Sequence, residues 1–341
     1  MHHTAHYPSI SDRFRIRALS AAFGMGTALL IGAAFTMPAT AQTFPTKPLR
    51  IIVPYQAAGA VDFAPRMLAE RMAADLGQPV LLENKTGGLG IPAMNDILNG
   101  APDGHLIFAA DASHWGINPA LGTVTYDFLK DFQPLSLTFT NGLVWVTAMP
   151  GINSMQDLIA AARANPGKLN YGSPGIGSVH HLGTEMFRAG LNLDVKHVPY
   201  RGAAEMTESI LRGDTAFMMI SKNSVEPHVK AGKMRWLAVT IATRLKQLPD
   251  VPTTAEVTSL KDFNLPGQQG FVVKAGTPRP IVDRLVASMR KGALQPDLYA
   301  KVLEVAASEM TPNTPEQFTD LIRADFKKFA TAVKISGAKA N

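Results

Sequence analysis

The residues best suited to chemistry lie in YGSPGIGSVHHLGTEMF, residues 171–187, where serines, glycines and two adjacent histidines crowd the start of an expected helix. Ser178 and His181 are three residues apart, a spacing that makes them neighbours on a helical turn. A serine hydrolase using this pair is the enzymatic alternative, but the histidine lacks an obvious orienting acid and no G-x-S-x-G motif is present. His180 and His181 lack the H-E-x-x-H spacing of a metal site. Catalysis and metal binding are therefore the less favoured interpretations.

The same stretch is better suited to binding. Ser178 is expected to cap the following helix, and its hydroxyl, together with the N–H groups of the first turn, can hold a carboxylate. Three other glycine-containing turns also lead from a strand into a helix, at residues 53–62, 84–91 and 198–204. In open α/β sheets ligands lie at the carboxyl ends of strands, so such turns in both halves of the chain predict a clamp for a small anion. Glycines that serve only tight turns are the alternative.

Short apolar runs alternate with segments of helical periodicity along most of the chain. Strands are expected at LRIIVPY, PVLLENK and HLIFAADAS in the first half, and at LNYGSPG, DVKHVPY, TAFMMIS and MRWLAVTI in the second. A separate strand is expected at GLVWVTAMP, after the segment DFQPLSLTFT, and the C-terminal tail is expected to be helical. This alternation predicts an α/β fold with two similar lobes joined by short crossing strands.

The composition excludes several classes of function. The chain has 341 residues, no cysteine and a formal net charge of +6. Without cysteine, thiol catalysis and Cys-based metal sites are excluded. The positive charge is scattered, with no Lys/Arg block, so nucleic acid is not an expected partner, while small anions are slightly favoured.

The N-terminus has the order of a secretory signal peptide. A basic segment, RFRIR, precedes the apolar run ALSAAFGMGTALLIGAAF, and Ala39 and Ala41 form an A-x-A cleavage signal before Gln42. Residues 1–41 are therefore expected to be removed on export to the periplasm, with a membrane anchor as the alternative. No later apolar run is long enough to span a membrane.

A series of motifs resembles one family. FPTKPLRIIVPY, PVLLENKTGG, APDGHLIF, INPALG, ANPGKLNYGSPGIGS, HVPYRGAA, PHVKAGKMRWLAVT and LPDVPTTAE occur in this order. Together they closely resemble the periplasmic substrate-binding proteins of tripartite tricarboxylate transporters, often called Bug proteins. The resemblance covers the chain from about Phe44 to the C-terminus.

The resemblance implies a type II periplasmic-binding fold: two α/β lobes joined by crossing strands, with a ligand cleft between them. The expected division is 42–142 for the first part of lobe 1, 143–243 for lobe 2, and 244–341 for the return to lobe 1 and the C-terminal helices. Such a protein binds a small organic carboxylate and delivers it to membrane transporter subunits. We expect a monomer that catalyses no reaction and uses no cofactor or metal.

The resemblance also implies the ligand contacts. In the first lobe they are Tyr55, Ala57, Ala58, Gly59, Ser113 and Asn118. In the second lobe they are Gly177, Ser178, His181, Tyr200, Arg201, Gly202, Ala203 and Ile220. Asn118 as a turn residue, Arg201 as a surface charge and His181 as a buried, hydrogen-bonded ring are the alternatives for those three positions.

The sequence departs from the family at two places, and both departures remove polarity from the expected cleft. The first loop reads QAAGAVD instead of a run of glycines ending in Thr-Asp, and Ile220 stands where the family often has an acid. These changes predict a ligand with an apolar or aromatic body in preference to citrate or aspartate. Met218, Met219 and Trp115 are candidates for apolar surface in the cleft, with core packing as their alternative role. Signalling to a membrane sensor kinase is the alternative output.

Overall fold

The computed structural model describes residues 43–55, 57, 60–87, 90–306 and 308–338, and residues 44–341 form one unit by themselves. Within this unit, strands pair in the order β2-β1-β3-β9-β4-β7-β5-β6, and β8 and β10 also pair with β4. The expected signal peptide, with its cleavage site before Gln42, lies outside the described residues. No helix in the described part of the chain is both long and apolar enough to span a membrane.

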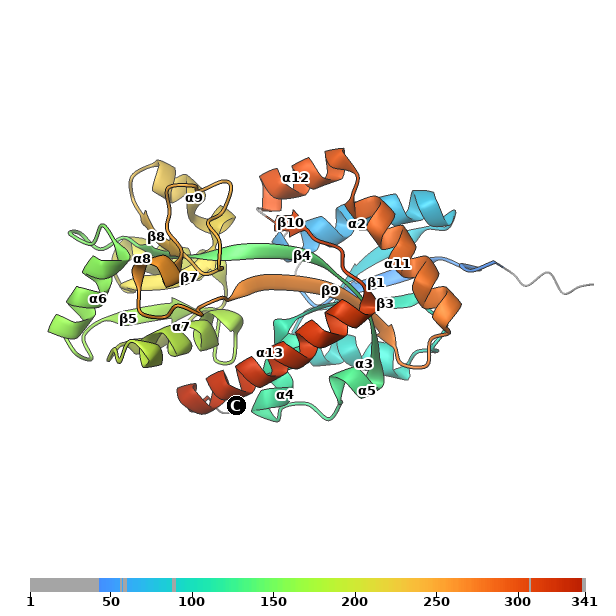
Figure 1. Cartoon of the computed structure of the whole chain (residues 1–341), viewed down its shortest axis with the longest axis horizontal. Helices are drawn as coiled ribbons and strands as arrows, with labels where there is room; N and C mark the ends of the chain where they lie inside the picture. The colour runs from blue at the N-terminus through green and yellow to red at the C-terminus, as the bar shows by residue number, and fades with distance from the viewer. Residues whose placement is uncertain (1–42, 56, 58–59, 88–89, 307, 339–341) are drawn as a thin grey trace, which may run out of the picture. The chain divides into compact units, whose positions relative to one another are not determined.

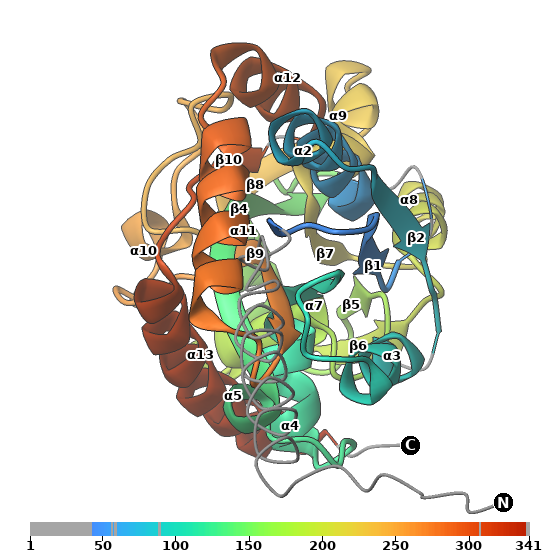
Figure 2. The same cartoon turned by 90° about the vertical axis from the view of Figure 1, so that its right-hand side faces the viewer.

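The first lobe is a layer of strands with helices on both faces (Figures 1 and 2). Its parallel strands are β1 (Leu49–Val53), β2 (Val80–Asn84) and β3 (Leu106–Asp111). The helices α2 (Ala60–Leu76), α11 (Arg279–Ala293) and α12 (Pro296–Ala306) pack in one apolar cluster with these strands. On the other face lie α3 (Ile91–Asn99), the π-helical turn η2 (Ser113–Ile117), α4 (Asn118–Leu121) and α5 (Phe128–Asp131). Apolar β1, buried at four of five positions, is the expected signature of a parallel strand covered on both faces.

The second lobe repeats this arrangement. Its strands are β5 (Asn170–Ser173), β6 (Lys196–Pro199), β7 (Phe217–Ser221) and β8 (Arg235–Val239). The helices α6 (Met155–Ala164) and α7 (Val179–Gly190) cover one face, and α8 (Ala203–Arg212) and α9 (Lys222–Lys230) cover the other. A short helix, α10 (Thr254–Val257), lies near β8. Ser154 caps the start of α6, since its side chain accepts a hydrogen bond from the Asp157 N–H.

Two long antiparallel strands connect the lobes. β4 (Phe132–Thr147) runs from one lobe into the other, and β9 (Pro266–Lys274) lies beside its first half (Figure 1). β4 pairs with β9 as far as Gly142 and with β7 from Leu143 onward. The segments DFQPLSLTFT and GLVWVTAMP, expected as separate elements, are thus mostly one continuous strand. The prediction of two α/β lobes joined by crossing strands is confirmed, but the crossing strands, expected to be short, are long.

The return to the first lobe ends in β10 (Ser308–Met310) and α13 (Pro315–Ser336). β10 pairs with the middle of β4, and α13 packs against both η2 and α7, so it contacts both lobes. A capping box at Thr314 and Gln317 fixes where α13 begins. We retain the lobe division 42–142, 143–243 and 244–341 as a proposal. The change of pairing partner within β4 motivates its first boundary, whereas α10, which contacts β8 of the second lobe, lies beyond its second.

Candidate functional site

A cavity of about 550 Å³ is lined by both lobes and by the crossing strands. From the first lobe its polar lining includes Tyr55, Asp111, Ser113, His114 and Asn118. From the second lobe it is lined by Gly175, Gly177, Ser178, His180 and Arg201. The crossing strands add Asn141, Gln268 and Gln269. This volume is within the usual range of small-molecule sites.

The first-lobe wall is organised around the Asp111 carboxylate at the end of β3. The Tyr55 hydroxyl donates to Asp111 Oδ2, and the Ser113 N–H donates to Oδ1 at 2.8 Å. The His114 ring lies 2.9 Å from Oδ1 through Nδ1. Burial opposes ionisation of Asp111, but the His114 ring and the donated hydrogen bonds outweigh it and hold the pKa of this carboxyl below its usual value. Burial, reinforced by Asp111, raises the pKa of Tyr55, which therefore remains a hydroxyl donor.

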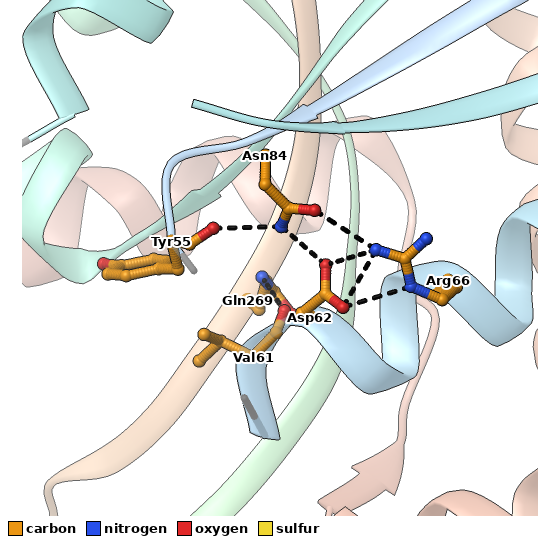
Figure 3. Close-up of polar contacts among 6 residues, drawn as sticks. All are labelled: Tyr55, Val61, Asp62, Arg66, Asn84 and Gln269. Atoms are coloured by element: carbon orange, nitrogen blue, oxygen red, sulfur yellow. Dashed lines mark hydrogen bonds and ion pairs between the residues drawn. The ribbon is translucent and has the colours of Figure 1, made fainter. Parts of the chain in front are cut away.

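A second carboxylate, Asp62 in the first turn of α2, fixes the backbone behind Tyr55 (Figure 3). Asp62 is 1 % exposed and pairs with Arg66, while Asn84 Nδ2 donates to both Asp62 and the Tyr55 carbonyl. Gln269 on β9 donates to the Val61 carbonyl at 2.9 Å. The pair of Asp62 and Asn84 thus joins α2 to β2, and Asn84 holds the Tyr55 carbonyl at the start of the loop, while Val61, next to Asp62, lines the cavity.

The second-lobe wall is the loop that enters α7. Ser178 is the N-cap: its hydroxyl accepts from the His181 N–H at 3.1 Å and donates to the Gly175 carbonyl at 2.8 Å. The Gly177 N–H donates to His181 Nδ1 at 3.2 Å. The Ser178 hydroxyl is therefore bonded to backbone groups, and the His181 imidazole accepts a hydrogen bond from the backbone of the same loop. This arrangement provides no nucleophile–base pair, so the hydrolase alternative has no geometric support.

The structure turns His180, not His181, toward the cavity. The His181 ring instead packs at a tilt of 39° against His197, with ring centroids 4.2 Å apart, and the residue is 5 % exposed. Neighbouring helical positions point about 100° apart, so only one of the two rings can face the ligand. Burial lowers the pKa of His180 to about 4, against an opposing effect of Asp111, so the ring is neutral near pH 7.

The predicted contacts divide into three groups. Tyr55, Ser113, Asn118, Gly177, Ser178 and Arg201 line the cavity. Ala58 and Gly59 lie outside the described residues. The residues that do not line it are Ala57, His181, Tyr200, Gly202, Ala203 and Ile220. Three residues that line the cavity were not identified from the sequence: Asp111, His114 and His180. For Asp111, a charged residue at the carboxyl end of a parallel strand was a usable signal.

The placement of Ile220 corrects the specificity argument. Ile220 is 2 % exposed and packs in the core with Val144 and Met206, while the next residue, Ser221, lines the cavity. Successive strand residues point to opposite faces, so the expected position was one residue off. Met218 and Met219 are likewise in the core, and the Trp115 indole donates to Asp325 at 3.0 Å.

Tyr200 and the residues after it also have roles away from the cavity. The Tyr200 hydroxyl bonds to Thr215 at 2.6 Å, and Gly202 is the N-cap of α8. Arg201, exposed at its side chain, is the only Lys or Arg among the described residues that line the cavity.

Replacing Ser178 with alanine should lower stability by about 1 kcal/mol through loss of the N-cap. It should also weaken ligand binding, because the same hydroxyl lines the cavity. Ser154→Ala is the matched control, since Ser154 caps α6 in the same way without lining the cavity. Thermal melts and calorimetric titrations of both variants test this. Equal affinities in the two variants would show that the Ser178 hydroxyl acts only as a cap.

Stability should fall as the pH drops from 6.5 toward 4. Burial lowers the pKa values of His180 and His197 from 6.5 to about 4, and the neighbouring His181 ring adds to the effect on His197. The unfolded chain takes up these protons below pH 6.5 while the folded protein does not, so the contribution is complete above 6.5 and is lost as the pH falls. At pH 5 the loss is about 2 kcal/mol for each ring.

Melting temperatures at pH 7.5 and pH 5.0 check this expectation. His180→Gln should remove about half of the difference, because it removes one of the two rings. Equal melting temperatures at the two pH values would contradict the assignment of neutral, partly buried rings.

The fold and the cavity together define a two-lobed solute-binding protein. The chain belongs to the family described as "Tripartite tricarboxylate transporter family receptor", whose model matches residues 64–337. It is 30% identical to protein BugT of Bordetella pertussis over 310 residues, covering 90% of this chain and 94% of BugT. The family is one of periplasmic solute-binding proteins.

Solved structures agree with this assignment. The periplasmic binding protein BugD is similar with a TM-score of 0.74 and 26% identity, covering 87% of this chain and all of BugD (100%). The Rhodopseudomonas palustris protein Rpa4515, solved with adipate, is similar with a TM-score of 0.78 and 26% identity, covering 87% of this chain and 99% of Rpa4515.

Proposed function

We propose that this protein captures a small organic carboxylate in the cavity between its lobes, in the periplasm, and delivers it to the membrane subunits of a tripartite tricarboxylate-type transporter. The observation that carries the proposal is the cavity itself, which both lobes line with hydroxyls, amides and loop backbone. The adipate in Rpa4515, a similar protein, supports a carboxylate ligand. The signal-peptide pattern of residues 1–41 supports export.

The lining accounts for the binding of an anion without a cluster of cations. Arg201 supplies a formal positive charge, and α7 begins at the cavity with Ser178 as its cap. The N-terminal end of a helix carries partial positive charge and unsatisfied N–H groups, which favour a carboxylate. Neutral donors that line a cavity from two sides bind an anion with geometric selectivity.

The apolar body proposed for the ligand now depends on other residues. Ile220 no longer supports it, but Val61, Ile176 and Val179 line the cavity and give it an apolar part. A ligand with a carboxylate at one end and methylene or aromatic carbon elsewhere fits such a lining.

A thermal-shift screen of the protein tests the proposal. The panel is benzoate, succinate, adipate, malate, aspartate and citrate, with sodium chloride at matched ionic strength as control. A true ligand at 100 times its dissociation constant stabilises the fold by about 2.7 kcal/mol, or several degrees for a protein of this size. The proposal fails if no acid in the panel shifts the melting temperature more than the salt control. Loss of cellular uptake of the bound acid on gene deletion tests the transport step.

A further inference from the structure

One feature of the cavity is unexpected for a carboxylate site: its lining includes a carboxylate. Asp111 lines the cavity with its side chain 17 % exposed. Within the described residues no Lys or Arg forms an ion pair with it, and its neighbours are the Tyr55 hydroxyl, the Ser113 N–H and His114. A carboxylate that no Lys or Arg pairs with repels a second negative charge brought close to it.

The hydrogen bonds of Asp111 leave room for one more donor. Oδ1 accepts the Ser113 N–H and contacts the His114 ring, while Oδ2 accepts only the Tyr55 hydroxyl among the described groups. An ionised carboxylate has about four acceptor positions over its two oxygens. Oδ2 therefore retains acceptor capacity.

No Lys or Arg side chain among the described residues offsets this charge, and the His114 ring, the basic side chain that contacts the carboxylate, lies at Oδ1 and leaves Oδ2 to the Tyr55 hydroxyl. Tyr55 and Ser113 are neutral donors from the same lobe, and His180 from α7 in the opposite lobe is kept neutral by burial. Asn118 adds a buried amide to the same wall. A ligand that places a donor against Oδ2 gains a charge-assisted hydrogen bond, whereas one that places a carboxylate there meets electrostatic repulsion.

We propose that Asp111 is a specificity-determining residue that selects carboxylates carrying a hydroxyl or ammonium donor and discriminates against the same carbon skeleton without one. The proposal rests on the proposed function, because it concerns the same cavity. It reverses the ranking expected from Ile220, which placed apolar acids above malate and aspartate. One ligand can satisfy both features, with an apolar part against the apolar lining and a donor group against Asp111.

Calorimetric titration with two matched triples tests this. One triple is succinate, malate and aspartate; the other is adipate, 2-hydroxyadipate and 2-aminoadipate. In wild type, the hydroxyl or ammonium member of at least one triple should bind about 10-fold or more tightly than the plain acid, the difference expected of one charge-assisted hydrogen bond. Comparing the affinities of the hydroxy acid and the amino acid in each triple shows which donor is preferred.

Asp111→Asn removes the charge but retains an oxygen that can accept the Ser113 N–H. The variant should reduce the ratio of the affinities for the derivative and the plain acid to about 3-fold or less. It should also bind the plain acid more strongly, because the repulsion between Asp111 and the ligand carboxylate is gone. Asp320→Asn is the control, since Asp320 is 77 % exposed on α13 and its replacement changes the net charge equally. A merely structural role for Asp111 would weaken all three acids alike and leave their ratios unchanged.

The wild-type ratios test the proposal even if the Asp111 variant does not fold. A plain acid that binds as tightly as its derivatives, or no binding by either triple, contradicts the selection by Asp111. If carboxylates bind without such a preference, the proposed function stands and only this inference fails. If no carboxylate binds at all, both fail.

Discussion

Gly177→Val should reduce ligand affinity by about 100-fold or more, because it obstructs the contact between the lobes and distorts the α7 loop. Gly177 has a φ of +79°, and a Cβ there would lie 2.7 Å from Leu121 Cδ1 across the lobe boundary. A β-branched residue is strongly disfavoured at this φ. The Gly177 N–H donates a hydrogen bond to His181 Nδ1, and the loop lines the cavity. Displacement of the loop therefore changes the shape of the site directly.

Gly213→Val is the matched control for this prediction. Gly213 has a φ of +82°, caps the end of α8, and a Cβ there would meet nothing within 4 Å. It should lose similar stability through backbone strain but keep wild-type affinity. Calorimetric titration of both variants with the tightest acid of the screen measures the difference. Gly177→Val with wild-type affinity would mean that the lobe contact at Leu121 has no part in binding.

Arg188→Ala should destabilise the second lobe by about 3 kcal/mol and lower the melting temperature by roughly 5–10 °C. Glu185 on α7 is 5 % exposed, and Arg188 donates to both of its carboxylate oxygens, with a closest distance of 2.6 Å. The Tyr171 hydroxyl also donates to Glu185 at 2.6 Å. Removing the guanidinium leaves a buried carboxylate with a single side-chain donor, which is costly. The same pairing raises the pKa of Arg188.

Arg323→Ala provides the comparison for Arg188. Arg323 pairs with Asp320 at the same i,i+3 spacing on α13, but both side chains are exposed, at 63 % and 77 %. Exposed pairs contribute little, so this variant should melt close to wild type. Differential scanning calorimetry of the two variants gives the result. Equal melting temperatures would indicate that Glu185 finds other partners or water once Arg188 is gone.

Most strands and helices were predictable because the sequence signals for them depend on neighbouring residues. The apolar run of β1 and the Ser178 cap of α7 depend on neighbouring residues only. The continuity of β4 was not predictable in this way. Its polar midpoint, Asn141 and Gly142, looks like a break in the chain, and only pairing with β9 and β10, distant in sequence, keeps it extended.

The site was predictable to the level of loops, but not to that of single side chains. The turns after β1, β2, β5 and β6 were identified because glycines at strand ends have a direct physical meaning, whereas the contacts after β3 came from the family resemblance. The choice between His180 and His181, or between Ile220 and Ser221, depends on the rotation of a helix or the register of a strand. An error of one residue changes which side chain faces the cavity, and this removed Ile220 from the argument about specificity.

Native mass spectrometry tests the central claim, that a small carboxylate occupies the cavity between the lobes, most directly. The wild type and Gly177→Val, both freed of co-purified ligand by unfolding and refolding, are sprayed with each acid of the thermal-shift panel. We expect a one-to-one adduct of the wild type with at least one acid, and its loss in the variant. No adduct with any acid, or equal occupancy in the two proteins, would contradict this account.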